Sequence, residues 1–187
     1  MQLRSEIQIQ TAIKAMTEVV LPALDPHDKI AAEQGQLVVG MLALLGQQLP
    51  LQYRFDRDEL TRLHAFAAAL HPRASWPASA REAFAEMDSA AAGAEDVLDR
   101  ARAEPHELEE SIKRLRHAMT SVVRTVFSAD DADARSAVRD SVMAMSEQQL
   151  LRDRSWLLMQ NWEPNPQAVP PIEELLSVSE PRGEGAT

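Results

Sequence analysis

The histidines are the first residues to test for chemistry, because the chain has five of them and no cysteine. Helical proteins often hold paired metal ions with inward Glu side chains and two Glu-x-x-His motifs. No histidine in this sequence has a carboxylate three residues before it. The lack of cysteine also removes thiolate nucleophiles, disulfides and cysteine-bound zinc. We therefore expect no metal and no other cofactor.

One combination of residues could nevertheless bind a metal or exchange protons. His106, Glu110 and His117 lie within about 40° of one another on a helix that advances 100° per residue. The apolar stripe that runs from Leu108 to Val126 is centred almost opposite to them. Charged and polar residues opposite an apolar stripe are typical of a solvated helix face. The pattern therefore predicts surface residues rather than a site.

A second pair of histidines, His64 and His71, flanks the apolar side of a helix predicted at about 57–71. A histidine in a cleft there could act as a general base or a ligand, although no carboxylate partner is identifiable. A boundary position, and the favourable effect of a helix C-terminus on a histidine, explain the pair without a site. Nucleophile, phosphate-binding and dinucleotide-binding motifs do not occur in the sequence. We predict no catalytic residues and expect that the protein is not an enzyme.

Two glutamines give the strongest sequence signal for a polar pocket. Gln34 and Gln48 fall near the middle of the apolar face of a helix predicted at about 26–49. A buried amide without a partner costs about 1–3 kcal/mol, so both side chains need one. A structural hydrogen-bond network that includes Gln10 on the first helix is the simpler interpretation. The alternative is a ligand pocket lined by Gln10, Gln34, Gln48 and His64.

The elements that position these residues are all predicted to be helices. Hydrophobic residues make up 45% of the chain and aromatic residues only 4%, so Ala, Leu, Val and Met dominate, as suits helix packing. The 187 residues fit one domain. Apolar residues recur at helical spacing in six stretches. We therefore predict an all-α, single-domain bundle of about six helices, at about 3–24, 26–49, 57–71, 80–103, 105–127 and 131–160.

The second of these helices, at 26–49, is expected at the centre of the bundle. It is apolar over most of its circumference, which is typical of a helix with neighbours on several sides. Gly35, Gly40 and Gly46 each cost up to about 1 kcal/mol relative to Ala inside a helix. Close approach of a neighbouring helix would offset this cost, and flexibility is the competing explanation.

The last helix, at 131–160, has more apolar surface than one neighbour can cover. Besides its main stripe, Met143, Leu150 and Leu157 recur at heptad spacing on a second face. The helix either passes between elements of its own fold or uses this face to self-associate, and we favour a homodimer. The predicted interface consists of Met143, Leu150, Leu151, Trp156, Leu157, Leu158 and Trp162.

Prolines interrupt the sequence beyond residue 162, so we predict a helical domain at 1–162 and an extended or disordered tail at 163–187. An apolar island in this tail could form a short helical turn. Because an isolated helix of this length is marginal in water, docking on the chain itself is the simpler expectation. Docking on a partner protein is the alternative. The island consists of Ile172, Leu175, Leu176 and Val178.

The charge limits the kinds of partner. With 19 basic and 29 acidic residues, the net charge is −10, which disfavours binding to nucleic acids and anionic membranes. The uncharged stretch at 34–53 contains several glutamines and Pro50, so it predicts a core helix rather than a membrane span. The N-terminus lacks the pattern of a signal peptide, and we expect a cytoplasmic protein.

Together, these observations predict a noncatalytic helical interaction or accessory protein that self-associates and binds a protein partner. The alternative is a small-molecule-binding or enzymatic helical bundle, with a pocket lined by polar residues of the first three helices.

Overall fold

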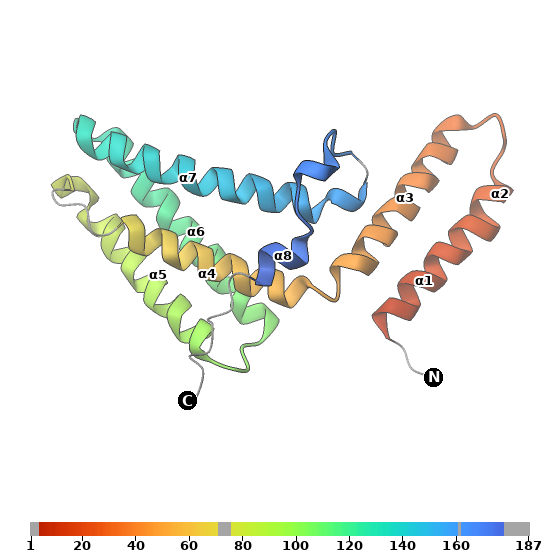
Figure 1. Ribbon diagram of the computed structural model, residues 1–187, viewed down its shortest axis with the longest axis horizontal. Helices are drawn as coiled ribbons and strands as arrows, with labels where there is room; N and C mark the ends of the chain where they lie inside the picture. The colour runs from red at the N-terminus through yellow and green to blue at the C-terminus, as the bar shows by residue number, and fades with distance from the viewer. Residues whose placement is uncertain (1–3, 71–75, 161, 178–187) are drawn as a thin grey trace. The chain divides into compact units, whose positions relative to one another are not determined.

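The computed structural model describes residues 4–70, 76–160 and 162–177, and in these parts every regular element is a helix (Figure 1). The prediction of an all-α fold is confirmed. Among the described residues, seven α-helices are six residues or longer, rather than six, because the apolar island in the predicted tail forms a helix of its own. None of the helices in this described part is long and apolar enough to cross a membrane.

The chain divides into two compact units, so the single-domain organisation is not confirmed. The predicted boundary after residue 162 stays a prediction. The first unit consists of residues 1–52 and 153–172, and the second consists of residues 53–152 and 173–187.

A helical hairpin forms most of the first unit. The helix α1 (Ser5–Ala15) continues through a π-helical turn (Met16–Val20) into the short α2 (Leu21–Ala23), and α3 (Lys29–Gln48) packs against α1. Asp28 caps α3, since its Oδ1 atom accepts a hydrogen bond of 2.9 Å from the backbone N–H of Ala31. A side-chain oxygen at this position satisfies a backbone donor that the helix leaves open.

Two glycines of α3 let α1 and α2 come close. A Cβ atom on Gly35 would lie 2.5 Å from Cδ2 of Leu21, and one on Gly46 would lie 3.3 Å from Cγ2 of Ile9. The close approach predicted from the glycines is therefore confirmed at these two positions. At Gly40 a Cβ atom would meet nothing within 4 Å among the described residues, so close packing does not explain that glycine.

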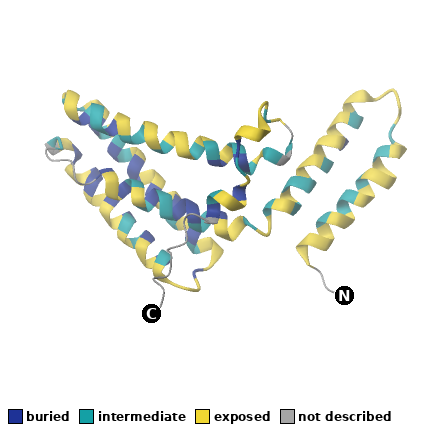
Figure 2. Ribbon diagram, viewed as in Figure 1, coloured by how far each residue is buried: buried dark blue, intermediate teal, exposed yellow. Residues whose placement is uncertain are grey.

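The second unit contains four long helices around one hydrophobic core. They are α4 (Gln52–Leu70), α5 (Arg81–Asp99), α6 (Pro105–Ser128) and all but the end of α7 (Ala132–Trp156), with a 3₁₀ turn (Ala78–Ala80) before α5. Figure 2 shows dark blue buried segments along α4, α5 and α6, whereas α1 and α3 are mostly teal and yellow. The inward stripe predicted for α6 is buried as expected: Leu108, Ile112, Leu115, Met119, Val122 and Val126.

In the second unit, α4 is linked by polar contacts to each of the other three long helices. Arg57 donates a hydrogen bond of 2.6 Å to the carbonyl oxygen of Leu98, which is at the end of α5. Glu59 pairs with Arg116 of α6, and Asp58 pairs with Arg152 of α7. By contrast, the only buried residue of α3 is Gly35. The central position predicted for the segment 26–49 is not confirmed.

The chain beyond α7 belongs to the first unit as far as Ile172 and to the second unit from Glu173. Its elements are two 3₁₀ turns (Leu158–Gln160 and Pro166–Ala168) and the short helix α8 (Ile172–Ser177). The Ser155 hydroxyl donates a hydrogen bond of 2.7 Å to the carbonyl oxygen of Pro170. Arg154 forms a two-pronged ion pair with Glu163, at 2.9 and 2.8 Å. These contacts hold residues 163–170 against the last turn of α7.

Candidate functional site

A buried arginine at the end of α7 organises the polar part of the second unit. The side chain of Arg152 is only 1% exposed, and its Nε atom lies 2.8 Å from Oδ2 of Asp58. Its Nη2 atom donates a hydrogen bond to the carbonyl oxygen of Phe55, and the guanidinium carbon lies 3.7 Å from the centre of the Phe55 ring. A charged group taken out of water needs such partners, because an uncompensated buried charge costs several kcal/mol. Arg152 therefore fixes α7 against the first turns of α4.

Two more arginines complete this ion cluster. Nε of Arg62 lies 2.9 Å from the same Oδ2 atom of Asp58. Nη2 of Arg116 lies 2.6 Å from Oε1 of Glu59. The five side chains, Arg62, Arg116, Arg152, Asp58 and Glu59, carry three positive charges and two negative charges. The cluster itself therefore has a net charge of +1 in a protein of net charge −10.

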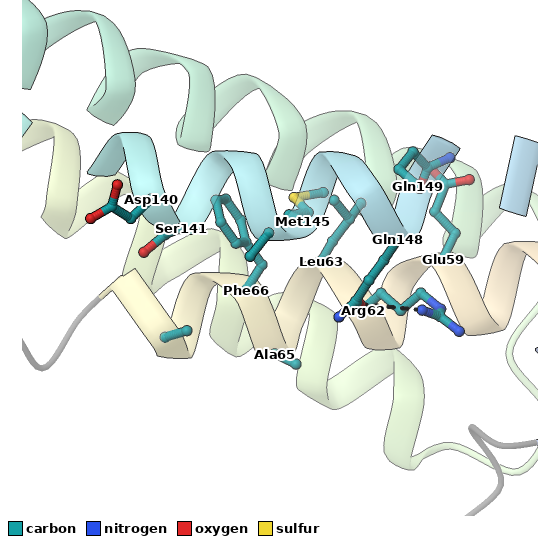
Figure 3. A pocket seen from close by; sticks show the side chains of 12 residues that line it. Glu59, Arg62, Leu63, Ala65, Phe66, Asp140, Ser141, Met145, Gln148 and Gln149 are labelled. Carbon is teal, nitrogen blue, oxygen red and sulfur yellow. Dashed lines mark hydrogen bonds between the residues drawn. The ribbon is translucent and has the colours of Figure 1, made fainter. Parts of the chain in front are cut away.

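A cavity of about 410 Å³ lies beside this cluster, between α4 and α7 (Figure 3). This volume is in the range of small-molecule sites. Its walls are apolar in the middle and polar at both ends. The lining residues are Glu59, Arg62, Leu63, Ala65, Phe66, Ala69, Asp140, Ser141, Ala144, Met145, Gln148 and Gln149.

The two walls of this cavity run in opposite directions. Nη1 of Arg62 lies 3.4 Å from Oε1 of Gln148, which places the early turns of α4 beside the late turns of α7. In Figure 3, Arg62 and Gln148 are at one end, Asp140 and Ser141 at the other, and Phe66 and Met145 lie between them. The cavity is thus an elongated groove with Arg62 and Glu59 at one end, an apolar middle, and Asp140 at the other end. Glu59 at this end is already paired with Arg116.

The first unit has a different kind of surface, on α3. Ile30, Leu37, Met41 and Leu45 are all exposed, and they lie within about 80° of one another around the helix. We call these four residues the α3 face. Gly35 and Gly46, on the side that meets α1 and α2, lie roughly 130° away. The sequence predicted a helix with neighbours on several sides, but the four residues of the α3 face are on the surface. The side of α3 that packs within the hairpin consists mainly of smaller apolar residues: Ala31, Ala32, Gly35, Val39, Leu42 and Gly46.

A second cavity of about 590 Å³ adjoins the α3 face within the first unit. It reaches from α3 to the segment after α7, where Trp162 is 74% exposed. Its lining is Glu33, Gln36, Leu37, Gly40, Met41, Ala43, Leu44, Gln47, Gln160 and Trp162. The large exposed tryptophan extends the apolar surface beyond the helix itself.

The residues predicted to line a polar pocket are not gathered around either cavity. Gln10 and Gln34 are exposed, so the premise that Gln34 has a buried amide is not met. Gln48 is half-buried and donates a hydrogen bond of 3.3 Å to the carbonyl oxygen of Trp156. His64 is half-buried in the second unit, whereas the three glutamines belong to the first. His71 lies outside the described residues.

The heptad residues predicted on the second face of the last helix are on the surface. Met143, Leu150 and Leu157 are exposed, as is Trp162. The other predicted interface residues, Leu151, Trp156 and Leu158, are half-buried. Met143 and Leu150 belong to the second unit, and Leu157 to the first.

The apolar island of the tail is mostly buried in the single chain. Ile172 and Leu176 of α8 are buried and Leu175 is half-buried, while Val178 lies outside the described residues. Before the island, the hydrogen bond from Arg154 and then the backbone N–H of Asn165 lower the pKa of Glu163 to about 2. Glu163 therefore stays ionised at all but the most acidic pH values and keeps this segment attached to α7.

The polar residues on the outer side of α6 are on the surface. His106, Glu110 and His117 are all exposed, as the position of the α6 stripe predicts. Within the described ranges, no group of three or more His, Asp or Glu side chains is placed to hold a metal ion. Comparison with protein-family models, with curated proteins and with solved structures gave no match.

Sequence reasoning missed the ion cluster, although one signal for it was present. Arg152 follows Val138 and Met145 at heptad spacing, so it occupies a position of the main apolar stripe of α7. A charged residue at a core position indicates a buried partner. Asp58 and Glu59 could have been that partner, but the helix predicted at about 57–71 placed them in its first turn, whereas α4 begins at Gln52.

Proposed function

We propose that this protein is a noncatalytic helical interaction protein that self-associates through the α3 face. The observation that carries this proposal is that the large apolar residues Ile30, Leu37, Met41 and Leu45 are exposed, while the side of α3 that packs within the hairpin consists mainly of smaller apolar residues. Exposed apolar residues that are scattered singly need no explanation, but a contiguous patch usually marks an interaction surface. The α3 face and the neighbouring Trp162 form such a patch.

The occupant that fits this surface best is a second copy of the same hairpin. No charged residue occurs between Glu33 and Arg54. Two copies with a net charge of −10 each repel one another, and an uncharged stretch lets them meet without pairing like charges. Four helices from two hairpins can also share one core, which is the arrangement of a four-helix bundle. The α3 face therefore suits a symmetric dimer.

The polar residue within this face is compatible with twofold symmetry. Gln34 lies in the angular range of the four apolar residues and is exposed. A side-chain amide has both donors and an acceptor, so it can pair with the same amide of a second copy. Full burial of a Leu or Met side chain contributes about 1.5–3 kcal/mol. Since these residues are about half exposed, covering each one would contribute roughly half of that value.

A single charge in the α3 face tests this proposal. Met41 and Leu150 are both 60% exposed, on α3 and α7 respectively, so Met41→Glu and Leu150→Glu are a matched pair. We expect the wild type to have twice the chain mass of 20.7 kDa by light scattering after gel filtration. Met41→Glu should reduce the mass to that of one chain, because each copy would bury an uncompensated carboxylate in the interface. Leu150→Glu should leave the dimer intact.

Two results would contradict the proposal. A wild type of single-chain mass at tens of micromolar would exclude stable self-association. If instead Leu150→Glu dissociates the dimer and Met41→Glu does not, the interface is the α7 stripe of Met143, Leu150 and Leu157. Binding of a further protein, and a cytoplasmic location, stay predictions of the sequence. Because Ile172 and Leu176 are already buried, we do not include a partner that docks on them.

A further inference from the structure

We infer that the groove between α4 and α7 binds an amphiphilic carboxylate, with its acid group at Arg62 and its apolar chain along Phe66 and Met145. This inference concerns the second unit and is independent of self-association through the first. It gives the protein a ligand site in addition to its proposed interaction surface.

The end of the groove at Arg62 has hydrogen-bond donors to offer. Arg62 uses Nε to bind Asp58 and Nη1 to bind Gln148. In the part of the chain that the structure describes, Nη2 of Arg62 and Nε2 of Gln148 have no hydrogen-bond acceptor. A carboxylate can accept hydrogen bonds from such donors, and hydrogen bonds between charged groups are the stronger ones.

The charge of Arg62 is only partly neutralised. The one carboxylate that it contacts, Asp58, is shared with Arg152, and the five-residue ion cluster has a net charge of +1. The side chain of Arg62 is 28% exposed, so an arriving anion meets this charge where water screens it less than at the open surface. The local electrostatics therefore favour an anion at this end, even though the whole protein is acidic.

The middle of the groove suits an alkyl chain or a ring. Leu63, Phe66, Ala69, Ala144 and Met145 line it, with no charged group among them. Along α4 the lining extends from Glu59 to Ala69, about 15 Å at 1.5 Å per residue. A flexible thioether such as Met145 adapts its shape to different apolar ligands. The groove thus has the length and polarity of a binding site for an elongated amphiphile.

The opposite end of the groove, at Asp140, is a weaker site for a charged head group than the end at Arg62. Asp140 is exposed, so water screens its charge, and it attracts a cation weakly. An amine-headed amphiphile would therefore gain little at Asp140, and it would be repelled by the net positive cluster if it turned round. The charge of Arg62 is less solvated than that of Asp140, so the groove prefers a negatively charged head group.

Three probes with the same alkyl chain test the inference: octanoate, octylamine and 1-octanol. The readout is the methyl resonance of Met145, which lines the groove, against that of Met143, which is exposed on α7 and does not line it. We expect octanoate to shift the Met145 resonance saturably and to bind at least about tenfold more tightly than the other two, as the strength of a charge-assisted hydrogen bond implies. The Met143 resonance should not move.

Variants separate the head-group contact from the ion cluster. Arg62→Gln should weaken octanoate binding about tenfold. Arg116→Gln removes the same charge from the same cluster but does not line the groove, so it should weaken octanoate binding less than Arg62→Gln does. Ala144→Phe should weaken all three probes by filling the groove, and circular dichroism melting curves check that each variant is folded.

Several results would overturn the inference. One is octylamine or 1-octanol binding as tightly as octanoate, because the groove would then not distinguish a carboxylate from other head groups. Another is an unchanged affinity of Arg62→Gln for octanoate. A third is the absence of a saturable Met145 shift with any of the three probes.

Discussion

The two units of this chain bury their apolar residues to very different extents. The second unit contains the whole contiguous core, from Leu60 of α4 to Val138 of α7. In the first unit, the large apolar residues of α3 are mainly on the surface. The second unit therefore has the means to fold by itself, whereas the first has apolar surface left to cover. We therefore expect stability to come mainly from the second unit, and the proposed self-association to use the first.

The largest expected effect concerns the buried ion cluster. Arg152→Ala leaves Asp58 and Glu59 buried without one of their counter-charges, and it should lower the free energy of unfolding by about 3–5 kcal/mol. Chemical denaturation measures this loss. The matched control is Arg154→Ala, two residues further along α7 but in the first unit, where the pair with Glu163 is partly exposed. If the two variants lose equal stability, the second unit is not the dominant source of stability.

The second largest expected effect is the loss of stability when a core leucine is replaced by alanine. Leu115 is fully buried in α6, and Leu115→Ala should cost about 2–5 kcal/mol through lost burial and a cavity. Leu45 of α3 is 52% exposed, and Leu45→Ala should cost less than about 0.5 kcal/mol at concentrations where the protein is monomeric. At high protein concentration Leu45→Ala should also weaken the dimer, whereas Leu115→Ala should act on the stability of the second unit alone. A large loss for Leu45→Ala in the monomer would contradict the exposed position of the α3 face.

The smallest effect tests how the hairpin is packed. Gly40→Ala should raise the free energy of unfolding by about 0.5–1 kcal/mol, because alanine favours the helix and nothing described lies within 4 Å of its new Cβ atom. At Gly35 the same change should gain less or destabilise, since the Leu21 side chain must move. Thermal melts of the two variants, side by side, measure the difference. An equal gain at both positions would mean that α2 and α3 do not pack closely at Gly35.

How far the sequence predicted the fold depended on the helix. The helix α6 has polar residues opposite one apolar stripe, so its start at Pro105, its buried side and its exposed histidines all followed from periodicity. The helix α3 is apolar on several sides, and periodicity could not decide which of them would face its neighbours. The small volume of Gly35 and Gly46, rather than hydrophobicity, determines the side on which α3 packs.

The candidate sites could be predicted only in part. The heptad of Met143, Leu150 and Leu157 predicted either a helix between two neighbours or a self-association surface, and these residues are exposed in the single chain. The groove between α4 and α7 could not be found in the same way, because its two walls come from helices far apart in the sequence. Arg62 and Asp58 alone read as an ordinary surface pair four residues apart on one helix. Their position beside a groove depends on where α7 packs.

The discontinuity of the first unit bears on the order in which the protein is made. Residues 1–52 leave the ribosome well before residues 153–172, and the roughly one hundred residues between them take about 5–20 s to synthesise at typical rates. The hairpin of α1 and α3 is therefore complete while the rest of the chain is still being translated. Neighbouring ribosomes on one messenger carry several such hairpins at once, so two nascent chains have time to pair before either is released.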